Sequence, residues 1–278
     1  MTHTQTASAS TDAQSGRRGL EFRMVSVLRA RDLTPRMRRL VLGGAELGGF
    51  EIPGRALGPY IKLLIPPEDD AGPSWRSTGS DSQLIWPSSK RRSAMRTYSV
   101  RAFDRDAQEL TVDVVLHGES GVGSRWARRV KPGSTVGLWG PGVMTSGGVD
   151  WHILAGDHTA LPAIAYILEH LPETARGQAF IEVPDAAEQQ PLRHPAGMQL
   201  EWLHRNCGAP TSSTLPDRVR ASHSPTGARV LVWTGAEAAT ARAIRHHARR
   251  ERRLAPDQVH VLNYWKRGAA EGAFDYCA

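Results

Sequence analysis

Hydrophobic residues in the first half of the chain recur at every second position, in short runs divided by Gly, Pro and Asp clusters. The clearest run has four apolar residues spaced two apart, Leu110, Val112, Val114 and Leu116. Side chains alternate between the two faces of a strand, so this run predicts a strand with one buried face. Strands are predicted in EFRMVSVL, MRRLVL, YIKLLIP, RTYSVRAF, ELTVDVVLH and TVGLWG. Short strands between turns are typical of an antiparallel barrel or sandwich, and we predict an antiparallel β-barrel over residues 18–146.

The hydrophobic period changes after about residue 148, where continuous apolar strands alternate with segments of helical length. Strands are predicted in WHILAG, QAFIEVP, MQLEWLH, ARVLVWTG and QVHVLNYW, and helices in DHTALPAIAYILEHL, TSSTLPDRVRA and EAATARAIRHHARRERR. Alternating strands and helices imply right-handed crossovers and a largely parallel, doubly wound sheet. We therefore predict an α/β domain over residues 147–278.

The length of 278 residues and a hydrophobic content of 40% suit two domains. Residues 1–17 are rich in Ser, Thr and Gln and contain no apolar stretch, which predicts a disordered tail. The polar residues 66–93 predict a long loop between strands. No apolar run approaches the roughly 20 residues of a membrane span, so we expect a cytoplasmic protein without membrane insertion.

The charge and the cysteine pattern exclude several classes of protein. The formal net charge is +7, but the basic residues are spread along the chain without a nucleic-acid-reading motif, so we expect no nucleic-acid partner. Cys207 and Cys277 form no Cys-x-x-Cys pair, which disfavours a disulfide framework or a zinc ribbon. His246 and His247 are adjacent on a predicted helix and cannot share a ligand face. We expect no metal site.

Two common catalytic motifs are absent. The serine motif G-x-S-x-G fails because residues 118–121 are followed by Val122, so a serine hydrolase is disfavoured. The fingerprint G-x-G-x-x-G occurs nowhere, which disfavours an ordinary Rossmann dehydrogenase. We assign no catalytic side chain.

The heptapeptide MRTYSVR carries an arginine, an aromatic ring and hydroxyl groups on one predicted strand. Tyr98 points to one face of the strand, whereas Thr97 and Ser99 point to the other. Together with Arg96, these groups suit a flat aromatic ligand that carries phosphates.

The segment HGESGVGSRWARR, residues 117–129, follows the clearest strand and opens a short helix through a glycine-rich turn. Glycines let the backbone approach a ligand, and the N–H groups at a helix start attract phosphate oxygens. Ser124 would lie near that helix start. An ordinary strand-to-helix turn is the alternative, but the turn and the strand with Arg96 and Tyr98 together favour a diphosphate-containing cofactor.

Parallel strands end at one edge of the sheet, where such sheets bind ligands, and three segments are predicted at this edge: GDHTALP, WTGAEA and NYWKRG. In GDHTALPAI, Asp157 or Thr159 is available to cap the next helix, and the turn could receive a dinucleotide or simply join packed elements. At the end of the last strand, two amphipathic rings and two cations lie where a cofactor would open to solvent: Tyr264, Trp265, Lys266 and Arg267. A core position is the alternative for Trp265.

The helix around residues 236–253 carries one apolar stripe and many arginines. The stripe, Ala238, Ala241, Ile244 and Ala248, predicts a buried face. We interpret the arginines as a solvated face, with one or two possible contacts to a 2′-phosphate.

The chain resembles the ferredoxin–NADP reductase superfamily and, within it, the siderophore-interacting proteins, which are FAD-containing ferric-siderophore reductases. The resemblance runs from about residue 20 to 268. It depends on the order of the motifs IKLLIP, RTYSVR, HGESGVGSRWA, GPG, GDHTALPAI, WTGAEA and VHVLNYWKRG.

This resemblance implies a flavin-binding barrel in which Arg96 pairs with the FAD phosphates, Tyr98 stacks on the isoalloxazine and Ser99 hydrogen-bonds the flavin. The remaining cofactor-binding positions are Thr97, His117, Gly118, Gly123, Ser124, Asp157, Thr159, Ala160 and Trp265. The substrate-binding positions that the resemblance implies are Lys62, Arg128 and Lys266. Lys62 also alternates away from the apolar face of its own strand.

The resemblance further implies that NADPH or NADH reduces FAD and that FAD reduces Fe(III) held by a siderophore. His158 stands where many relatives have an acidic residue, so we expect an effect on nicotinamide docking or on donor choice. Two alternatives stay open: a flavin-free protein that binds a siderophore or another anion without turnover, and a flavin reductase that serves a protein partner such as ferredoxin.

Overall fold

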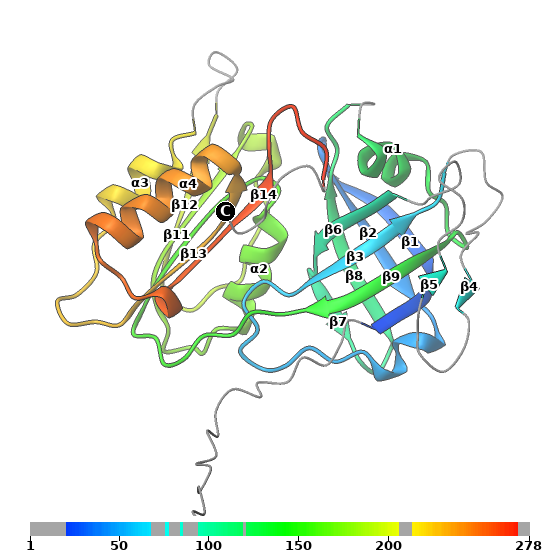
Figure 1. The fold of residues 1–278 in the computed structure, drawn as a ribbon, viewed down its shortest axis with the longest axis horizontal. Coiled ribbons are helices and arrows are strands. Elements are labelled where there is room, and N and C mark those ends of the chain that lie inside the picture. The colour runs from blue at the N-terminus through cyan, green and yellow to red at the C-terminus, as the bar shows by residue number, and fades with distance from the viewer. Residues whose placement is uncertain are drawn as a thin grey trace, which may run out of the picture.

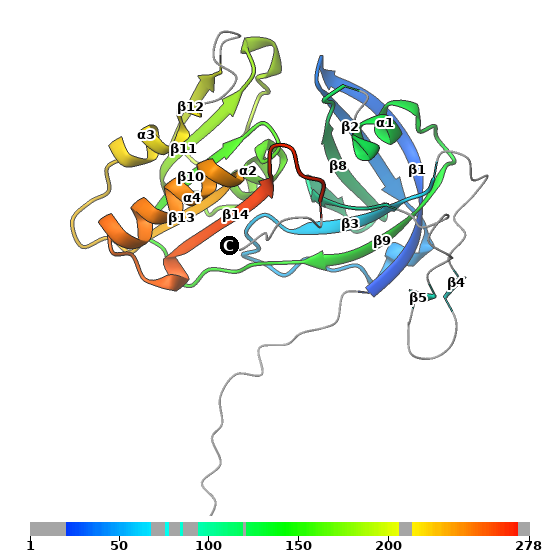
Figure 2. The same cartoon turned by 45° about the horizontal axis from the view of Figure 1, so that its top comes forward.

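A computed structural model describes residues 21–67, 76–77, 84–85, 94–118, 121–205 and 213–271 of the chain. Its two main sheets are a seven-stranded sheet in the N-terminal half and a five-stranded sheet in the C-terminal half (Figures 1 and 2). The predicted tail, most of the predicted loop 66–93 and both cysteines lie outside the described residues. Within the described residues, no helix is long and apolar enough to cross a membrane.

The N-terminal sheet has the strand order β6-β3-β9-β1-β2-β8-β7, and its strands pair antiparallel. The strands are β1 (Glu21–Thr34), β2 (Met37–Gly43), β3 (Tyr60–Ile65), β6 (Ala94–Ser99), β7 (Ala102–Asp104), β8 (Glu109–Val115) and β9 (Thr135–Gly142). A separate pair is formed by β4 (Arg76–Ser77) and β5 (Leu84–Ile85), and η1 (Ala45–Gly49) and α1 (Val122–Arg129) complete this half. The sheet curls into an open barrel, which confirms the predicted fold (Figure 1).

The alternating run on β8 faces the barrel core as expected. Its four apolar side chains are at most 5% exposed, Leu110, Val112, Val114 and Leu116. The polar face is also covered in part, since Asp113 accepts two hydrogen bonds from the Arg39 guanidinium at 2.7 and 2.8 Å. The prediction of one strand over RTYSVRAF is wrong, because the chain leaves β6 after Ser99 and starts β7 at Ala102.

The C-terminal sheet is fully parallel, with the order β12-β11-β10-β13-β14. Its strands are β10 (Trp151–Asp157), β11 (Arg176–Val183), β12 (Gly197–His204), β13 (Val230–Glu237) and β14 (Val259–Trp265). The helices are α2 (Leu161–His170), η3 (Ala186–Glu188), α3 (Leu215–Ala221), α4 (Ala238–His246), the π-helical η4 (His247–Glu251) and η5 (Pro256–Gln258). The predicted long helix over residues 236–253 is therefore α4 followed by a π turn.

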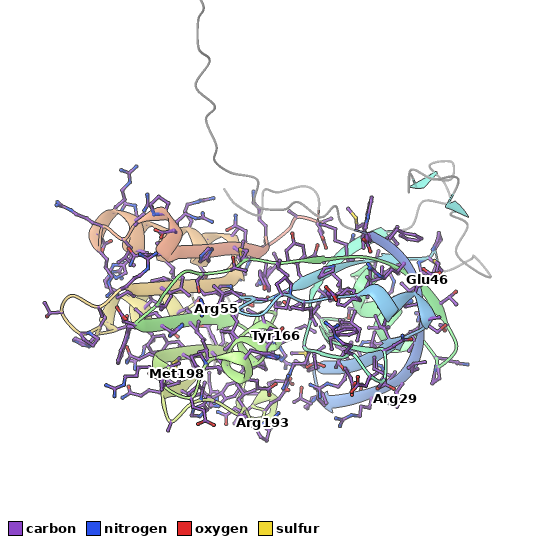
Figure 3. All side chains as sticks on the ribbon, turned by 90° about the horizontal axis from the view of Figure 1, so that it is seen from below. Arg29, Glu46, Arg55, Tyr166, Arg193 and Met198 are labelled. Carbon is purple, nitrogen blue, oxygen red and sulfur yellow. The ribbon has the colours of Figure 1, made fainter. Side chains whose placement is uncertain are left out.

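Helices cover both faces of this sheet (Figure 1). Helix α2 packs on one face together with Met37 and Leu57 of the N-terminal half, whereas α3 and α4 pack on the other face. Tyr166 of α2 lies between the two halves in Figure 3 and is 5% exposed. The two halves thus share one apolar core around α2.

Polar contacts fix β6 against the second half of the chain. Arg101, just after β6, donates two hydrogen bonds of 2.7 Å to the Glu169 carboxylate on α2. The hydroxyl groups of Ser99 and Tyr264 are 3.1 Å apart. Because Tyr264 belongs to β14, this contact holds the end of β6 beside the carboxyl edge of the parallel sheet.

Candidate functional site

The structure brings β6 and the start of α1 together. A Cβ atom built on Gly123 would lie 2.3 Å from the Tyr98 hydroxyl oxygen and 3.7 Å from Cγ of Arg96. Only glycine leaves room for this approach, because real Cβ atoms do not come within such a distance of a hydroxyl oxygen. The strand and the glycine-rich turn, which the sequence places far apart, therefore form one site.

The glycine-rich turn is closed by its own hydroxyl group. Ser124 is 1% exposed, accepts a hydrogen bond from the His117 N–H at 3.1 Å and donates one to the Gly118 carbonyl at 3.1 Å. Gly118 has a φ of 70°, in the left-handed region that favours glycine. No side chain of the described residues caps the start of α1 after Gly121, and the backbone N–H groups there suit an anion.

Tyr98 contributes a neutral aromatic ring to this site, and Arg96 contributes a charged hydrogen-bond donor. Burial raises the pKa of Tyr98, and the nearby Glu271 carboxylate raises it further while Arg96 lowers it. The phenol is therefore neutral and presents a flat ring with one hydroxyl. One guanidinium nitrogen of Arg96 donates to the Met95 carbonyl at 2.8 Å, and a guanidinium carries five N–H donors in all.

The opposite face of β6 carries a second set of polar groups. Thr97 accepts a hydrogen bond from the Lys62 ammonium at 3.1 Å and binds the Glu271 carboxylate. Lys62 points away from the apolar face of β3, as the alternation predicts, since Ile61 and Leu63 are fully buried. Burial raises the pKa of Tyr264 to about 12, so a neutral hydroxyl faces Ser99.

Asp157 joins the ends of three parallel strands. One carboxylate oxygen accepts from the Thr159 N–H at 2.9 Å and the Thr159 hydroxyl at 2.5 Å. The other accepts from the Glu237 N–H at 3.0 Å and the Trp265 indole N–H at 2.8 Å. Asp157 is 3% exposed, and burial raises its pKa while these hydrogen bonds lower it.

Asp157, Thr159 and Trp265, which the sequence analysis predicts as cofactor-binding residues, therefore lie together at the carboxyl edge of the sheet. In this structure their polar groups form hydrogen bonds with one another. Ala160 is fully buried as well, and its methyl group lies against Gly156 and Gly235. The bond between Asp157 and Trp265 was not anticipated. Contacts between these residues and a ligand stay predictions. Their hydrogen bonds hold the ends of β10, β13 and β14 together.

His158 lies in a buried contact between the two halves of the chain. Its Nε2 is 3.2 Å from the Glu188 carboxylate, which also accepts a hydrogen bond from the Thr34 hydroxyl at the end of β1. Burial, together with the charges of Arg36 and Arg205, lowers the pKa of His158 to about 4. The ring is therefore neutral at neutral pH, and its predicted effect on nicotinamide docking stays a prediction.

The remaining predicted substrate-binding cations are exposed. Arg128 lies in the last turn of α1, and Lys266 directly follows β14. Lys266 begins a turn that Gly268 closes with a φ of 73°. Among the described residues, no group of three or more His, Cys, Asp or Glu side chains is placed to hold a metal ion.

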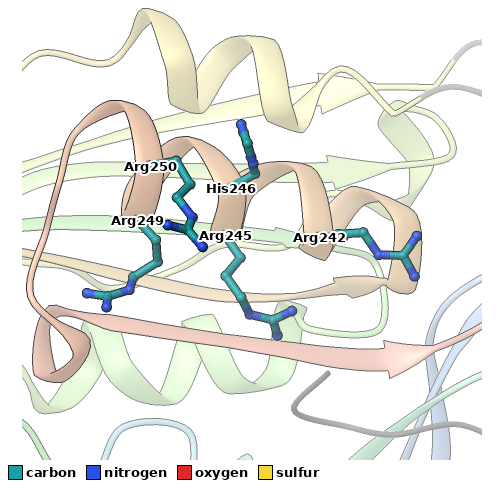
Figure 4. Close-up of a pocket in the computed structure, with 5 residues that line it drawn as sticks. All are labelled: Arg242, Arg245, His246, Arg249 and Arg250. Atoms are coloured by element: carbon teal, nitrogen blue, oxygen red, sulfur yellow. The ribbon is translucent and has the colours of Figure 1, made fainter.

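The arginine-rich surface of α4 and η4 forms a groove (Figure 4). Its lining residues are Arg242, Arg245, His246, Arg249 and Arg250. The sequence analysis interprets these arginines as a solvated face, but two of them also form hydrogen bonds within the protein. Arg245 donates to the Val261 carbonyl at 2.7 Å and Arg249 to the Leu254 carbonyl, so both guanidinium groups also support the loop and strand that follow the helix.

Two family models match the chain. The model described as the siderophore-interacting FAD-binding domain matches residues 26–145, and the model described as siderophore-interacting protein matches residues 149–268. The chain therefore belongs to the siderophore-interacting protein family, and its barrel is the FAD-binding domain of that family. This confirms the predicted family and the predicted flavin cofactor.

Relatives with known names or structures match between 68% and 93% of the chain. The chain is 34% identical over 255 residues to the ferric vibriobactin reductase ViuB of Vibrio cholerae, covering 91% of this chain and 92% of that protein. It is 31% identical over 196 residues to the NADPH-dependent ferric-chelate reductase of Escherichia coli, covering 68% and 74%. A siderophore utilization protein from T. fusca has a similar structure, with a TM-score of 0.79, 35% identity and coverage of 93% and 97%.

Proposed function

We propose that this protein is an FAD-dependent reductase of ferric siderophores, which passes electrons from a reduced nicotinamide through FAD to Fe(III). The observation that carries the proposal is the convergence of Arg96, Tyr98 and the Gly123 turn on one side of the barrel. Two relatives of this chain are named as ferric reductases, which supports the same activity.

The residues at this site fit FAD. The guanidinium of Arg96 and the N–H groups at the start of α1 would hold the diphosphate, because both provide donors to phosphate oxygens. The neutral ring of Tyr98 would lie against the isoalloxazine, and the Ser99 hydroxyl offers a hydrogen bond at the other face of β6. When bound, FAD supplies hydride acceptance and the transfer of single electrons, which no side chain can provide.

The chain itself contributes orientation and electrostatics to the reduction of the iron. Lys62 and the exposed Lys266 would attract the anionic oxygen donors of a ferric chelate. Hard oxygen ligands hold Fe(II) less tightly than Fe(III), so reduction releases the metal. The formal net charge of +7 favours the encounter with an anionic substrate.

The electron donor that we propose is NADPH, as the name of the Escherichia coli relative indicates for that protein. NADH and reduced ferredoxin are the other donors to compare, since a basic surface also suits an acidic protein partner.

The experiment that tests the proposal follows the flavin absorbance of the FAD-loaded protein without oxygen. NADPH, NADH and reduced ferredoxin are added separately, and a ferric catecholate is then added with a colorimetric trap for Fe(II). We expect NADPH to bleach the flavin and the ferric chelate to restore its colour, with about two Fe(II) released per flavin. A flavin that NADPH bleaches but ferric chelates do not reoxidise would contradict the proposal and favour a flavin reductase that serves a protein partner.

A further inference from the structure

The backbone N–H and the side-chain hydroxyl of Thr97 both donate hydrogen bonds to the carboxylate of Glu271, near the end of the described chain. Both oxygens of Glu271 lie 3.0 Å from the Thr97 backbone nitrogen, and one of them lies 2.7 Å from the Thr97 hydroxyl oxygen. The backbone N–H is available for this bond because, among the strands that the structure describes, β6 is an edge strand that pairs with β3 alone. Two converging donors of this kind form an anion-binding position.

A cation stands directly behind this position. The Lys62 ammonium donates to the Thr97 hydroxyl at 3.1 Å, and the same hydroxyl donates to Glu271, so the three groups form one hydrogen-bonded chain. Such chains polarise their members and strengthen the binding of an anion at the end. The charge of Glu271 also acts on Tyr98, where it adds to the effect of burial in raising the pKa.

The route of the chain explains how Glu271 reaches β6. Strand β14 ends at Trp265, and the turn from Lys266 to Ala269 directs the following residues toward the barrel (Figures 1 and 2). Glu271 meets Thr97 across 174 positions of sequence. The short segment 266–271 therefore brings a cation and a carboxylate to the proposed substrate site.

We infer that Glu271 is an internal competitor for anionic substrate and thereby sets the charge of the ferric chelates that the site accepts; this inference rests on the proposed function. An anionic oxygen of a chelate would bind the Thr97 donors and Lys62 in place of the Glu271 carboxylate. A neutral chelate has no surplus anionic oxygen for this position and binds without displacing Glu271. The carboxylate thus selects against chelates of high negative charge.

The test measures binding of gallium(III) complexes, which mimic ferric chelates but accept no electron, by tryptophan fluorescence of the FAD-loaded protein. Glu271→Gln and Glu271→Ala are expected to bind the trianionic gallium tris-catecholate about threefold to tenfold more tightly than the unchanged protein. The affinity for a neutral gallium tris-hydroxamate should stay within about twofold. Glu173→Gln, which neutralises an exposed carboxylate in the turn after α2, is the matched control and should change neither affinity.

Other outcomes overturn the inference. Weaker or unchanged tris-catecholate binding by both Glu271 variants would show that the carboxylate only fastens the segment to β6. A higher affinity of Glu271→Gln for FAD, with chelate binding unchanged, would assign the Thr97 donors to the flavin. Because gallium binding needs no electron transfer, loss of the reductase proposal alone would leave the Glu271 comparison intact, whereas absence of chelate binding by every form would overturn both.

Discussion

Arg96→Ala is expected to weaken FAD binding about 10-fold to 100-fold, because a hydrogen bond to a charged group contributes about 1.5–3 kcal/mol. Arg96 lies beside Gly123 at the start of α1, where its guanidinium would face the same phosphates as the helix N–H groups. The flavin content per chain after gel filtration, followed by titration of the apoprotein with FAD, measures the effect. Arg96→Lys should recover only part of the affinity, since an ammonium cannot bind phosphate through two parallel donors.

The matched control for this variant is Arg105→Ala. Arg105 is exposed in the turn between β7 and β8 and pairs only loosely with Glu51, at 3.4 Å. Its loss should leave FAD binding unchanged. Equal FAD affinity of Arg96→Ala and Arg105→Ala would show that the arginine of β6 does not contact the diphosphate.

Asp157→Ala is expected to lower the free energy of unfolding by about 3 kcal/mol or more, the range seen when a buried charged partner is removed. The substitution leaves the N–H groups of Thr159 and Glu237 and the Trp265 indole N–H without their acceptor. Urea unfolding followed by tryptophan fluorescence measures the change.

Asp106→Ala is the control for this prediction, since Asp106 is exposed in the β7–β8 turn. It should change the free energy of unfolding by less than about 0.5 kcal/mol. If Asp157→Ala unfolds at the same urea concentration as the unchanged protein but loses affinity for NADPH, Asp157 is a ligand contact as first predicted from the sequence, and the positioning role is wrong.

The fold was predictable from the sequence because its periodic signals are local. The run from Leu110 to Leu116 defines the buried face of β8, and the stripe from Ala238 to Ala248 is buried in α4 and η4. The division of RTYSVRAF into two strands was not predictable. The chain changes its partner strand there, because β6 pairs with β3 whereas the Arg101 N–H donates to the Thr111 carbonyl of β8 at 2.8 Å, and no local pattern records these partners.

In the candidate site, too, the features with a local sequence pattern were predictable and the contacts between distant residues were not. The glycine-rich turn and the strand with Arg96 and Tyr98 each have a recognisable composition, so their meeting could be proposed from the sequence. Glu271 had no such pattern around it. Its hydrogen bond to Thr97 spans 174 positions and exists only once the two halves have docked, and the hydrogen bond between Asp157 and Trp265 spans 108 positions and exists only once β10 and β14 have joined the same sheet.

The central claim is that the barrel binds one FAD between β6 and the start of α1. Titration of the flavin-free protein with FAD, followed by quenching of the flavin fluorescence, tests it most directly. We expect saturable binding of about one FAD per chain, which yields a yellow protein that retains its flavin through gel filtration. A well-folded protein that stays colourless and takes up no FAD would contradict it.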